Sequence, residues 1–265
     1  MKAAPRSSSL ASGQRELLPL ELTGVRPGIP QGQHVAFVGD VGSQTYYCKS
    51  DRKGRGVCAT EWFYTSLASF LGIAVPDFTQ IRDPENGELL FGSKETWGTA
   101  DRFEVETLLT TPPNADRAIG DPYPWLASYL SRLYAFDLLI GNGDRHLANY
   151  LLVPGQGSRR LLAFDFASAE LEFGAISHFA IAESRTLFVG RQLRKLRTFD
   201  GVSATQLVNR AHAIPEADIE AILAGIPAEW LSNERRGRVY EQWSNGNLAK
   251  RLEALQCGLN DGSLL

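Results

Sequence analysis

The chain has 265 residues, of which 43% are hydrophobic, and its formal net charge is −3. A chain of this length can bury a sizeable core as one large domain or two lobes, and its slight acidity gives no electrostatic reason to expect a nucleic-acid partner. No apolar run is long enough to span a bilayer, and the first residues lack the apolar core of a signal peptide, so we expect a cytoplasmic protein without a membrane partner. An odd number of cysteines without metal-type spacing predicts reduced thiols at Cys48, Cys58 and Cys257.

The first hundred residues are predicted to be rich in strands. Residues 1–15 are polar and serine-rich, and we expect them to form a flexible N-terminal tail. Aromatic and β-branched residues on both sides of a Gly/Asp turn predict a hairpin with strands over 34–38 and 44–49. Apolar residues at helical spacing then predict a helix over 58–71. Asn86-Gly87 is typical of the tip of a second hairpin.

The rest of the chain is predicted to be mostly helical. A strong apolar face at helical spacing predicts a helix over 125–140, and its preceding proline suits a first helical turn. Further helices are predicted over 204–212, 216–224 and 235–255. These elements predict an α+β fold with two lobes, a small β-rich N-lobe over 16–98 and a larger helical C-lobe over 99–265. That order is the layout of protein kinases.

Two acids and one amide stand around a predicted hairpin. The segment Asn142-Gly143-Asp144-Arg145-His146-Leu147-Ala148-Asn149 precedes one short apolar run, and Asp165 follows a second. Phosphoryl transfer uses one carboxylate to orient the nucleophile, and an amide oxygen and a second carboxylate to hold Mg²⁺ against the triphosphate. The spacing of five between Asp144 and Asn149 equals that in the kinase catalytic loop. Each alone is an ordinary loop residue, but together we predict them as catalytic, with Asn149 and Asp165 as Mg²⁺ ligands.

The neighbours of Asp144 have two interpretations each. Arg145 is predicted to contact a cofactor phosphate, although an ion pair that braces the loop explains it equally well. His146 is grouped with the cofactor-binding residues too. Because no second His or Cys stands at metal-ligand spacing, we expect its ring to brace the loop by hydrogen bonds rather than to bind a metal. Asp137 lies near the apolar face of the preceding helix, where a buried carboxylate needs partners, so we predict that it supports the loop.

Lys49 ends a predicted strand, and Glu61 lies in the first turn of the following helix. A strand lysine that reaches the α- and β-phosphates and pairs with a helix glutamate is the kinase arrangement, so both are predicted to bind ATP. On their own they are a solvated strand-end lysine and an acid favoured at a helix start. Two glycine-containing segments, 39–43 and 54–56, are candidates for a loop over the phosphates, although a plain hairpin turn explains the first better. No P-loop motif is present.

One basic cluster is interleaved with leucines, Arg191-Gln192-Leu193-Arg194-Lys195-Leu196-Arg197. Such a cluster can contact RNA, an acidic protein or phosphate. Because the chain as a whole is acidic, a solvated helix face is the interpretation we favour.

The sequence resembles the HipA-like kinases in their compact form. The most specific resemblance is the run Ala135-Phe136-Asp137-Leu138-Leu139-Ile140-Gly141-Asn142 followed by Asp144-Arg145-His146 and Asn149. Glu61 with the turn Leu71-Gly72-Ile73-Ala74-Val75-Pro76 is similar to that family's first helix and its end. Phe91-Gly92-Ser93 and Ile226-Pro227-Ala228-Glu229-Trp230-Leu231 resemble further family segments. The Asp-Arg-His-x-x-Asn core is also similar to the phosphatidylinositol 3/4-kinases, a related fold.

The resemblance implies a bacterial kinase with ATP and Mg²⁺ as cofactors and a serine or threonine hydroxyl of a protein as acceptor. Carried over by position, Asp144 is the catalytic acid/base, Asn149 and Asp165 are metal ligands, and Lys49 is the phosphate lysine. The chain departs from ordinary protein kinases at Asp165-Phe166-Ala167, because alanine stands where the glycine of the Asp-Phe-Gly motif would be. This departure puts a flipping activation switch in doubt, but not metal binding. Some members are toxins with a small protein partner, so a small regulatory partner is left open here.

Two other functions compete with the protein kinase. A nucleotide-binding pseudokinase that serves as an interaction module is the first, but it has no need of Asp144. A kinase that phosphorylates a lipid or small-molecule hydroxyl is the second. The absence of a basic membrane-facing run argues against the lipid.

Overall fold

The computed structural model describes residues 18–26, 35–51, 56–112, 123–155, 158–173, 179, 184–244 and 246–265. The tail predicted over 1–15 and the glycine Gly54 lie outside these residues. Contacts group the chain into two compact units, Met1–Ser50 with Asp77–Glu95 (unit 1) and Asp51–Pro76 with Thr96–Leu265 (unit 2). The lobe boundary at residue 98 stays a prediction, and contacts group the helix that carries Glu61 with unit 2.

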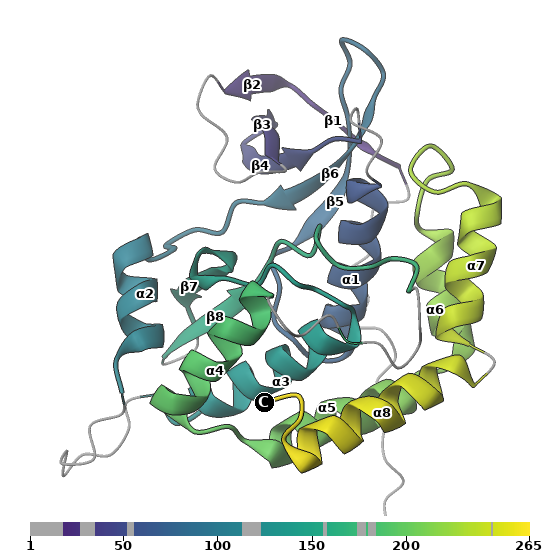
Figure 1. The fold of residues 1–265 in the computed structure, drawn as a ribbon. Coiled ribbons are helices and arrows are strands. Elements are labelled where there is room, and N and C mark those ends of the chain that lie inside the picture. Colours follow the sequence, from purple (N-terminus) through teal and green to yellow (C-terminus); the bar gives the residue numbers. More distant parts are fainter. Residues whose placement is uncertain are drawn as a thin grey trace, which may run out of the picture. The chain divides into compact units, whose positions relative to one another are not determined.

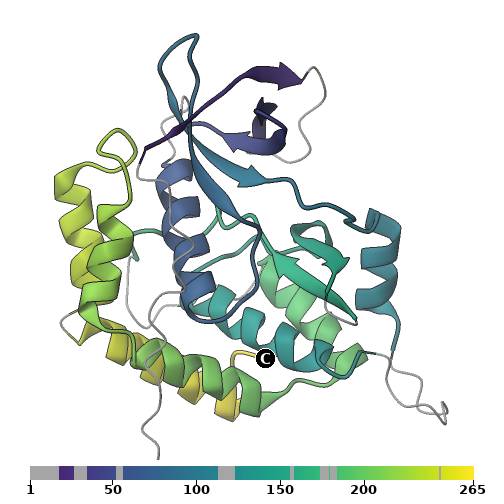
Figure 2. The same cartoon turned by 180° about the vertical axis from the view of Figure 1, so that it is seen from behind.

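Unit 1 is built on a six-stranded sheet in the order β1-β5-β6-β4-β3-β2 (Figures 1 and 2). Its strands are β1 (Leu20–Glu21), β2 (Gly24–Arg26), β3 (Val35–Val41), β4 (Gln44–Lys49), β5 (Phe78–Arg82) and β6 (Leu89–Lys94). Both hairpins predicted within the first hundred residues are confirmed, because β3 pairs antiparallel with β4 and β5 pairs antiparallel with β6. The short strand β1 pairs parallel with β5, a contact that no local pattern indicated.

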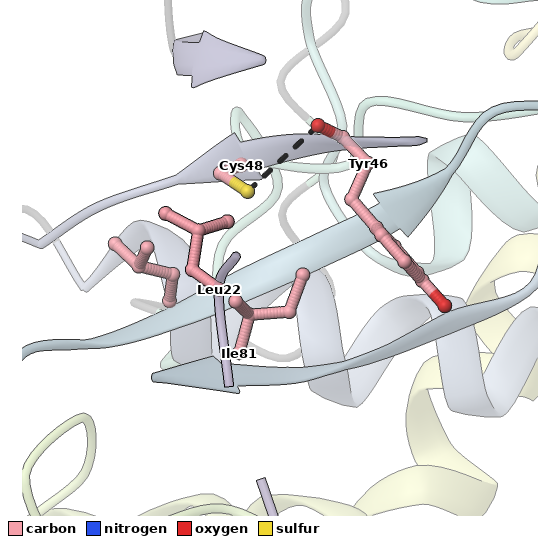
Figure 3. Packing of buried hydrophobic residues seen from close by; sticks show 5 residues of the cluster. Leu22, Tyr46, Cys48 and Ile81 are labelled. Atoms are coloured by element: carbon pink, nitrogen blue, oxygen red, sulfur yellow. Dashed lines mark hydrogen bonds between the residues drawn. The ribbon is translucent and has the colours of Figure 1, made fainter. Parts of the chain in front are cut away.

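A small apolar cluster fills the buried side of this sheet (Figure 3). It is formed by Leu22, Tyr46, Cys48, Ile81 and Leu90. Burial raises the pKa of the Cys48 thiol to about 12, so this thiol stays protonated and unreactive at neutral pH. A Cβ atom at Gly92 would lie 2.3 Å from Cδ1 of Ile81, so any other residue here would have to displace the Ile81 side chain. Cys48, Cys58 and Cys257 form no disulfide in the described structure.

Unit 2 contains the helices and a two-stranded hairpin. Its elements are α1 (Val57–Phe70), α2 (Arg102–Thr110), α3 (Leu126–Leu139), the 3₁₀ turn η1 (Leu147–Asn149), β7 (Tyr150–Pro154), β8 (Arg159–Ala163), α4 (Arg185–Arg197), α5 (Gly201–His212), α6 (Glu216–Ala224), α7 (Asn233–Trp243) and α8 (Asn247–Asp261). The mixed α+β fold class is confirmed. Within the described helices, none combines the length and the apolar character that a bilayer crossing requires.

The single helix predicted over 235–255 is wrong. The chain leaves the helix after Trp243, and a new helix, α8, begins at Asn247. The break lies at Gly246, whose φ of 77° is left-handed and favours glycine. Apolar periodicity continues through such a break, because both helices bury one face, and the pattern alone therefore indicates one helix.

Helices α1 and α3 form the interior of unit 2. Both are buried along most of their length rather than on one stripe, which is typical of helices inside a core. Phe63 of α1 is fully buried and lies edge-on to Trp243 of α7, with ring centroids 5.4 Å apart. Helix α3 packs against α5 and α8, so its C-terminal end is held in place before the chain enters the candidate catalytic loop.

We expect Phe63→Ala to destabilise the protein by about 3–5 kcal/mol, because it leaves a cavity among packed aromatic rings. Phe103→Ala is the matched control, since Phe103 is 76% exposed on α2, and its effect should stay within about 0.5 kcal/mol. Urea unfolding followed by circular dichroism measures both changes. Similar losses in the two variants would contradict the assignment of Phe63 to the core.

Candidate active site

The candidate catalytic loop begins where α3 ends. Gly141 has a φ of 65°, a left-handed conformation that reverses the chain. The backbone N–H of Asn142 then donates to the carbonyl of Asp137 at 2.8 Å, and its side-chain amide donates to the Asp137 carboxylate at 2.7 Å. The loop is therefore fastened to the last turn of the helix from which it leaves.

A buried ion pair between Asp137 and Arg145 holds the loop. The guanidinium meets the carboxylate through two bonds, Nε to Oδ2 and Nη2 to Oδ1, each 2.8 Å long. The two side chains are only 1% and 2% exposed. Burial acts to lower the pKa of Arg145, but the charge and hydrogen bonds of Asp137 outweigh it, so its pKa is raised and it stays charged. A paired, fully charged guanidinium is the result.

The remaining donors of Arg145 reach the hairpin that follows the loop. Its Nη1 donates to the carbonyl of Phe164 at 2.5 Å and to that of Asn149 at 3.4 Å. Of the two interpretations of Arg145, this arrangement supports the loop-bracing ion pair and gives no support to phosphate binding. Asp137 likewise contacts the loop that it was predicted to support.

Asp144 is the accessible acid of the loop. Its side chain is 33% exposed, and Oδ1 lies 3.0 Å from Nη1 of Arg185, the first residue of α4. The backbone N–H of Asp144 donates to the side-chain oxygen of Asn142 at 3.3 Å. A positioned carboxylate that solvent can reach is what a substrate hydroxyl requires of a catalytic acid/base.

The structure brings Asn149 and Asp165 together across the base of the β7–β8 hairpin. The amide nitrogen of Asn149 donates to Oδ2 of Asp165 at 3.3 Å, while its amide oxygen accepts the N–H of His146 at 3.0 Å. Asp165 has a φ of 63°, which is uncommon for a residue other than glycine. Strained conformations of this kind cluster at functional sites, and this one aims the carboxylate back toward Asn149.

The donors at this place suit Mg²⁺ chemically. The ion takes hard oxygen ligands and commonly uses only one or two carboxylates together with phosphates and waters. Asp165 supplies a carboxylate, and the amide oxygen of Asn149 keeps a second lone pair besides the one facing His146. Among the described residues no three His, Cys, Asp or Glu gather into a metal cage. The site therefore fits an ion held jointly with a phosphate rather than by protein alone.

His146 caps the 3₁₀ turn η1. Its Nδ1 accepts the backbone N–H of Ala148 at 3.2 Å, and the backbone N–H of His146 donates to the side-chain oxygen of Asn149 at 3.0 Å. Burial is the main cause that lowers the pKa of the ring. The imidazole therefore braces the loop in its neutral form, as the hydrogen-bonding interpretation predicts, and its cofactor role stays a prediction.

Sequence reasoning missed Thr186, the second residue of α4. Its buried hydroxyl donates to the carbonyl of Asn142 at 2.6 Å and accepts the backbone N–H of Arg145 at 2.9 Å. Arg185 was missed as well. Both stand some forty positions after the loop that they contact, with no motif around them, so no signal in the sequence could have found them.

Lys49 and Glu61 belong to different units. Lys49 is the last residue of β4 in unit 1, and Glu61 lies in α1 of unit 2; both side chains are buried. Their ion pair stays a prediction. Segment 39–43 forms the end of β3 and the turn into β4, which agrees with a plain hairpin turn. Of segment 54–56 only Gly56 is described, at the start of α1.

The pair Asp137–Arg145 should carry much of the stability of this region. We expect Arg145→Met to cost about 3–5 kcal/mol, because it leaves a buried carboxylate without its partner. Arg102→Met is the control: Arg102 forms an ion pair with Glu106 at 2.7 Å but is 75% exposed, so its loss should cost about 1 kcal/mol at most. Equal losses in urea unfolding would contradict a structural role specific to Arg145.

We expect His146 to make stability depend on pH. Its folded pKa is lowered, so the unfolded state binds the proton more readily, and stability is fully present above the unfolded pKa of about 6.5. It is lost progressively as pH falls from there through the folded pKa. NMR titration of the ring gives the folded pKa, and His146→Asn, which keeps a capping oxygen, should remove this step from the pH profile. A folded pKa above the ordinary value would refute it.

Comparisons with known proteins identify the family and the fold of the chain. A family model described as HipA-like kinase matches residues 25–257. The Helicobacter pylori proinflammatory kinase CtkA superposes with a TM-score of 0.60 at 11% identity, covering 94% of this chain and 100% of that one. HipA of Shewanella oneidensis MR-1, solved with HipB and its operator DNA, gives a TM-score of 0.46 at 12% identity, covering 83% and 59%. No curated protein matches. The chain belongs to the HipA-like kinase family and has a kinase fold.

Proposed function

We propose that this protein transfers the γ-phosphoryl group of ATP, with Mg²⁺, to a serine or threonine hydroxyl of a protein. The observation that carries the proposal is the geometry of one loop. The loop presents an accessible carboxylate, Asp144, and ends at Asn149, whose amide lies 3.3 Å from the carboxylate of Asp165 beyond the β7–β8 hairpin. Membership of a kinase family supports phosphotransfer over other uses of such a site.

Asp144 is proposed to act on the acceptor. Its carboxylate accepts a hydrogen bond from the hydroxyl, orients the oxygen toward the γ-phosphorus and takes the proton as the new O–P bond forms. The bond from the γ-phosphorus to the bridging oxygen breaks, and ADP leaves with that oxygen. Because Arg185 lies 3.0 Å from Asp144, the acceptor hydroxyl would meet a carboxylate that is already positioned.

Asn149 and Asp165 are proposed to hold Mg²⁺, which would neutralise charge on the β- and γ-phosphates. The left-handed backbone of Asp165 fixes the direction of its carboxylate, and Arg145 holds the preceding carbonyl at Phe164. Lys49 is proposed to meet the α- and β-phosphates from the sheet, with Glu61 as its partner. A protein acceptor rests on the family resemblance alone.

Substitutions of the two acids should separate metal binding from transfer. Asp165→Asn is expected to weaken Mg·ATP binding and remove transfer together, because it takes away a charge that holds the ion. Asp144→Asn is expected to bind Mg·ATP nearly as wild type while turnover falls by ~10²–10⁴-fold. Calorimetry gives the binding, and mass spectrometry of phosphoserine and phosphothreonine after incubation with Mg·ATP and cell lysate gives the transfer.

Asp101→Asn is the matched control for both. Asp101 is the exposed N-cap of α2, where asparagine caps equally well, so binding and transfer should not change. Full activity in Asp144→Asn would show that the catalytic carboxylate is misassigned. If wild type binds Mg·ATP but transfers phosphate to no acceptor, the protein is a pseudokinase. If the phosphate is found on a lipid or a small molecule, the acceptor is not a protein.

A further inference from the structure

Helix α4 is strongly basic in an acidic protein. Its thirteen residues, RTLFVGRQLRKLR, contain arginine and lysine but no aspartate or glutamate, whereas the whole chain has a net charge of −3. The basic cluster noted in the sequence lies in the second half of this helix; the side chains of Leu193 and Arg197 are outside the described residues. A one-sided charge of this kind on an exposed helix attracts a partner of opposite charge.

The start of α4 is fastened to the candidate catalytic loop by several bonds. Arg185 lies 3.0 Å from the carboxylate of Asp144. The hydroxyl of Thr186 bonds the backbone at Asn142 and Arg145, at 2.6 and 2.9 Å. These bonds fix the position of α4 relative to the loop. A molecule that lies along α4 would therefore have one end at Asp144.

The inner side of α4 packs against α3, and this packing determines which side chains of α4 face outward. Gly190 lies directly on the ring of Tyr134 of α3, where an added Cβ would come within 2.3 Å of the ring. Leu187 and Val189 are buried. The side chains at spacings of three and four from Arg185 point outward, and we name them the α4 face: Arg185, Phe188, Arg191 and Lys195.

An exposed aromatic ring interrupts the charges of the α4 face. Phe188 is 64% exposed, one of the few large apolar side chains of the described residues left in water. An open hollow of about 530 Å³ lies beside it, lined by Phe188, Arg191, Gln192, Arg194, Lys195 and Leu265. Cations around one apolar side chain match a polypeptide that carries acids and a hydrophobic residue close together.

We propose that the α4 face docks an acidic segment of the protein acceptor and so selects the serine or threonine to be phosphorylated. Its acids pair with Arg191 and Lys195, and an apolar side chain covers Phe188. The inference rests on the proposed kinase function and adds the chemistry of the substrate to it. Arg185, between Asp144 and the rest of the face, places the first acid next to the acceptor hydroxyl.

The length of the helix sets where the acids must be. Arg185 and Lys195 are ten residues apart, which is about 15 Å at the rise of an α-helix. An extended polypeptide covers that distance in about four or five residues. The acids are therefore expected within about five positions of the phosphorylated residue, on one side of it.

A nucleic acid would suit the basic charges less well. The basic residues of α4 form one short stretch in a chain with a net charge of −3, whereas a protein that follows a phosphate backbone neutralises many phosphates along its length. The contact with Asp144 also places one end of the face where a hydroxyl is to be phosphorylated. Protein is therefore the occupant we favour.

Peptides with a central serine or threonine test the proposal. Glutamate is moved one position at a time through the five positions on each side, and kcat and KM are measured with saturating Mg·ATP. Wild type should show a KM at least about tenfold lower for peptides with acids on one side than for the alanine peptide. Added salt should reduce that preference, because the charges are exposed.

The variant Arg191→Glu with Lys195→Glu should lose the preference and gain one for lysine at the same positions. Its KM for ATP and its kcat at saturating alanine peptide should stay near wild type, since neither residue belongs to the catalytic loop. Arg160→Glu with Lys250→Glu is the matched control, because both residues are exposed in unit 2 away from α4. This control should keep the wild-type preference.

The outcomes separate this inference from the proposed function. Transfer to peptides and proteins with no preference for acids, or a preference that survives the reversal of Arg191 and Lys195, overturns the α4 face as a docking surface while the kinase stands. Tight binding of a short RNA that the reversal abolishes, together with indifference to acidic peptides, overturns it in favour of nucleic acid. Absence of transfer to any acceptor refutes the kinase itself, and the docking proposal with it.

Discussion

The arrangement of the candidate active site depends on the buried ion pair between Asp137 and Arg145. Two opposite charges in a protein interior cost several kcal/mol each in lost hydration, and only good geometry with further hydrogen bonds offsets that cost. Both conditions hold here. The guanidinium meets the carboxylate through two bonds of 2.8 Å, and Asn142 donates a third bond to the same carboxylate.

The same pair connects three segments that are separate along the chain. Asp137 belongs to α3, Arg145 to the loop, and the carbonyl of Phe164, which Arg145 also binds, lies just before Asp165. A shift of any one segment would leave a charge or a carbonyl without its partner in the interior, which is costly. The ion pair consequently fixes the segments that carry Asp144 and Asp165, although neither of these two acids takes part in it.

The loop contacts a different structural element on each of its two sides. Toward the β7–β8 hairpin, Asn149 and Asp165 present oxygen atoms suited to a metal and its phosphates. Toward α4, Thr186 and Arg185 join the loop to a basic helix. A nucleotide on the first side and an acceptor on the second would meet near Asp144, which belongs to the loop itself and contacts the second side through Arg185.

Local patterns in the sequence determined the hairpins, the helices predicted over 58–71 and 125–140 and the spacing from Asp144 to Asn149, because each of these depends on residues within a few turns of one another. The sequence also indicated that Asp137 supports the loop and that Arg145 could brace it by an ion pair, but only the structure showed that these two side chains are each other's partner. Tertiary structure alone decided that Arg185 and Thr186 reach the loop, because their approach requires α4 to lie on α3 with Gly190 against Tyr134. It also decided the break between α7 and α8, where α7 ends at Trp243 and a left-handed glycine, Gly246, precedes the new helix while the apolar pattern continues. Contacts between distant segments are set by how whole elements pack, and no spacing along one chain encodes them.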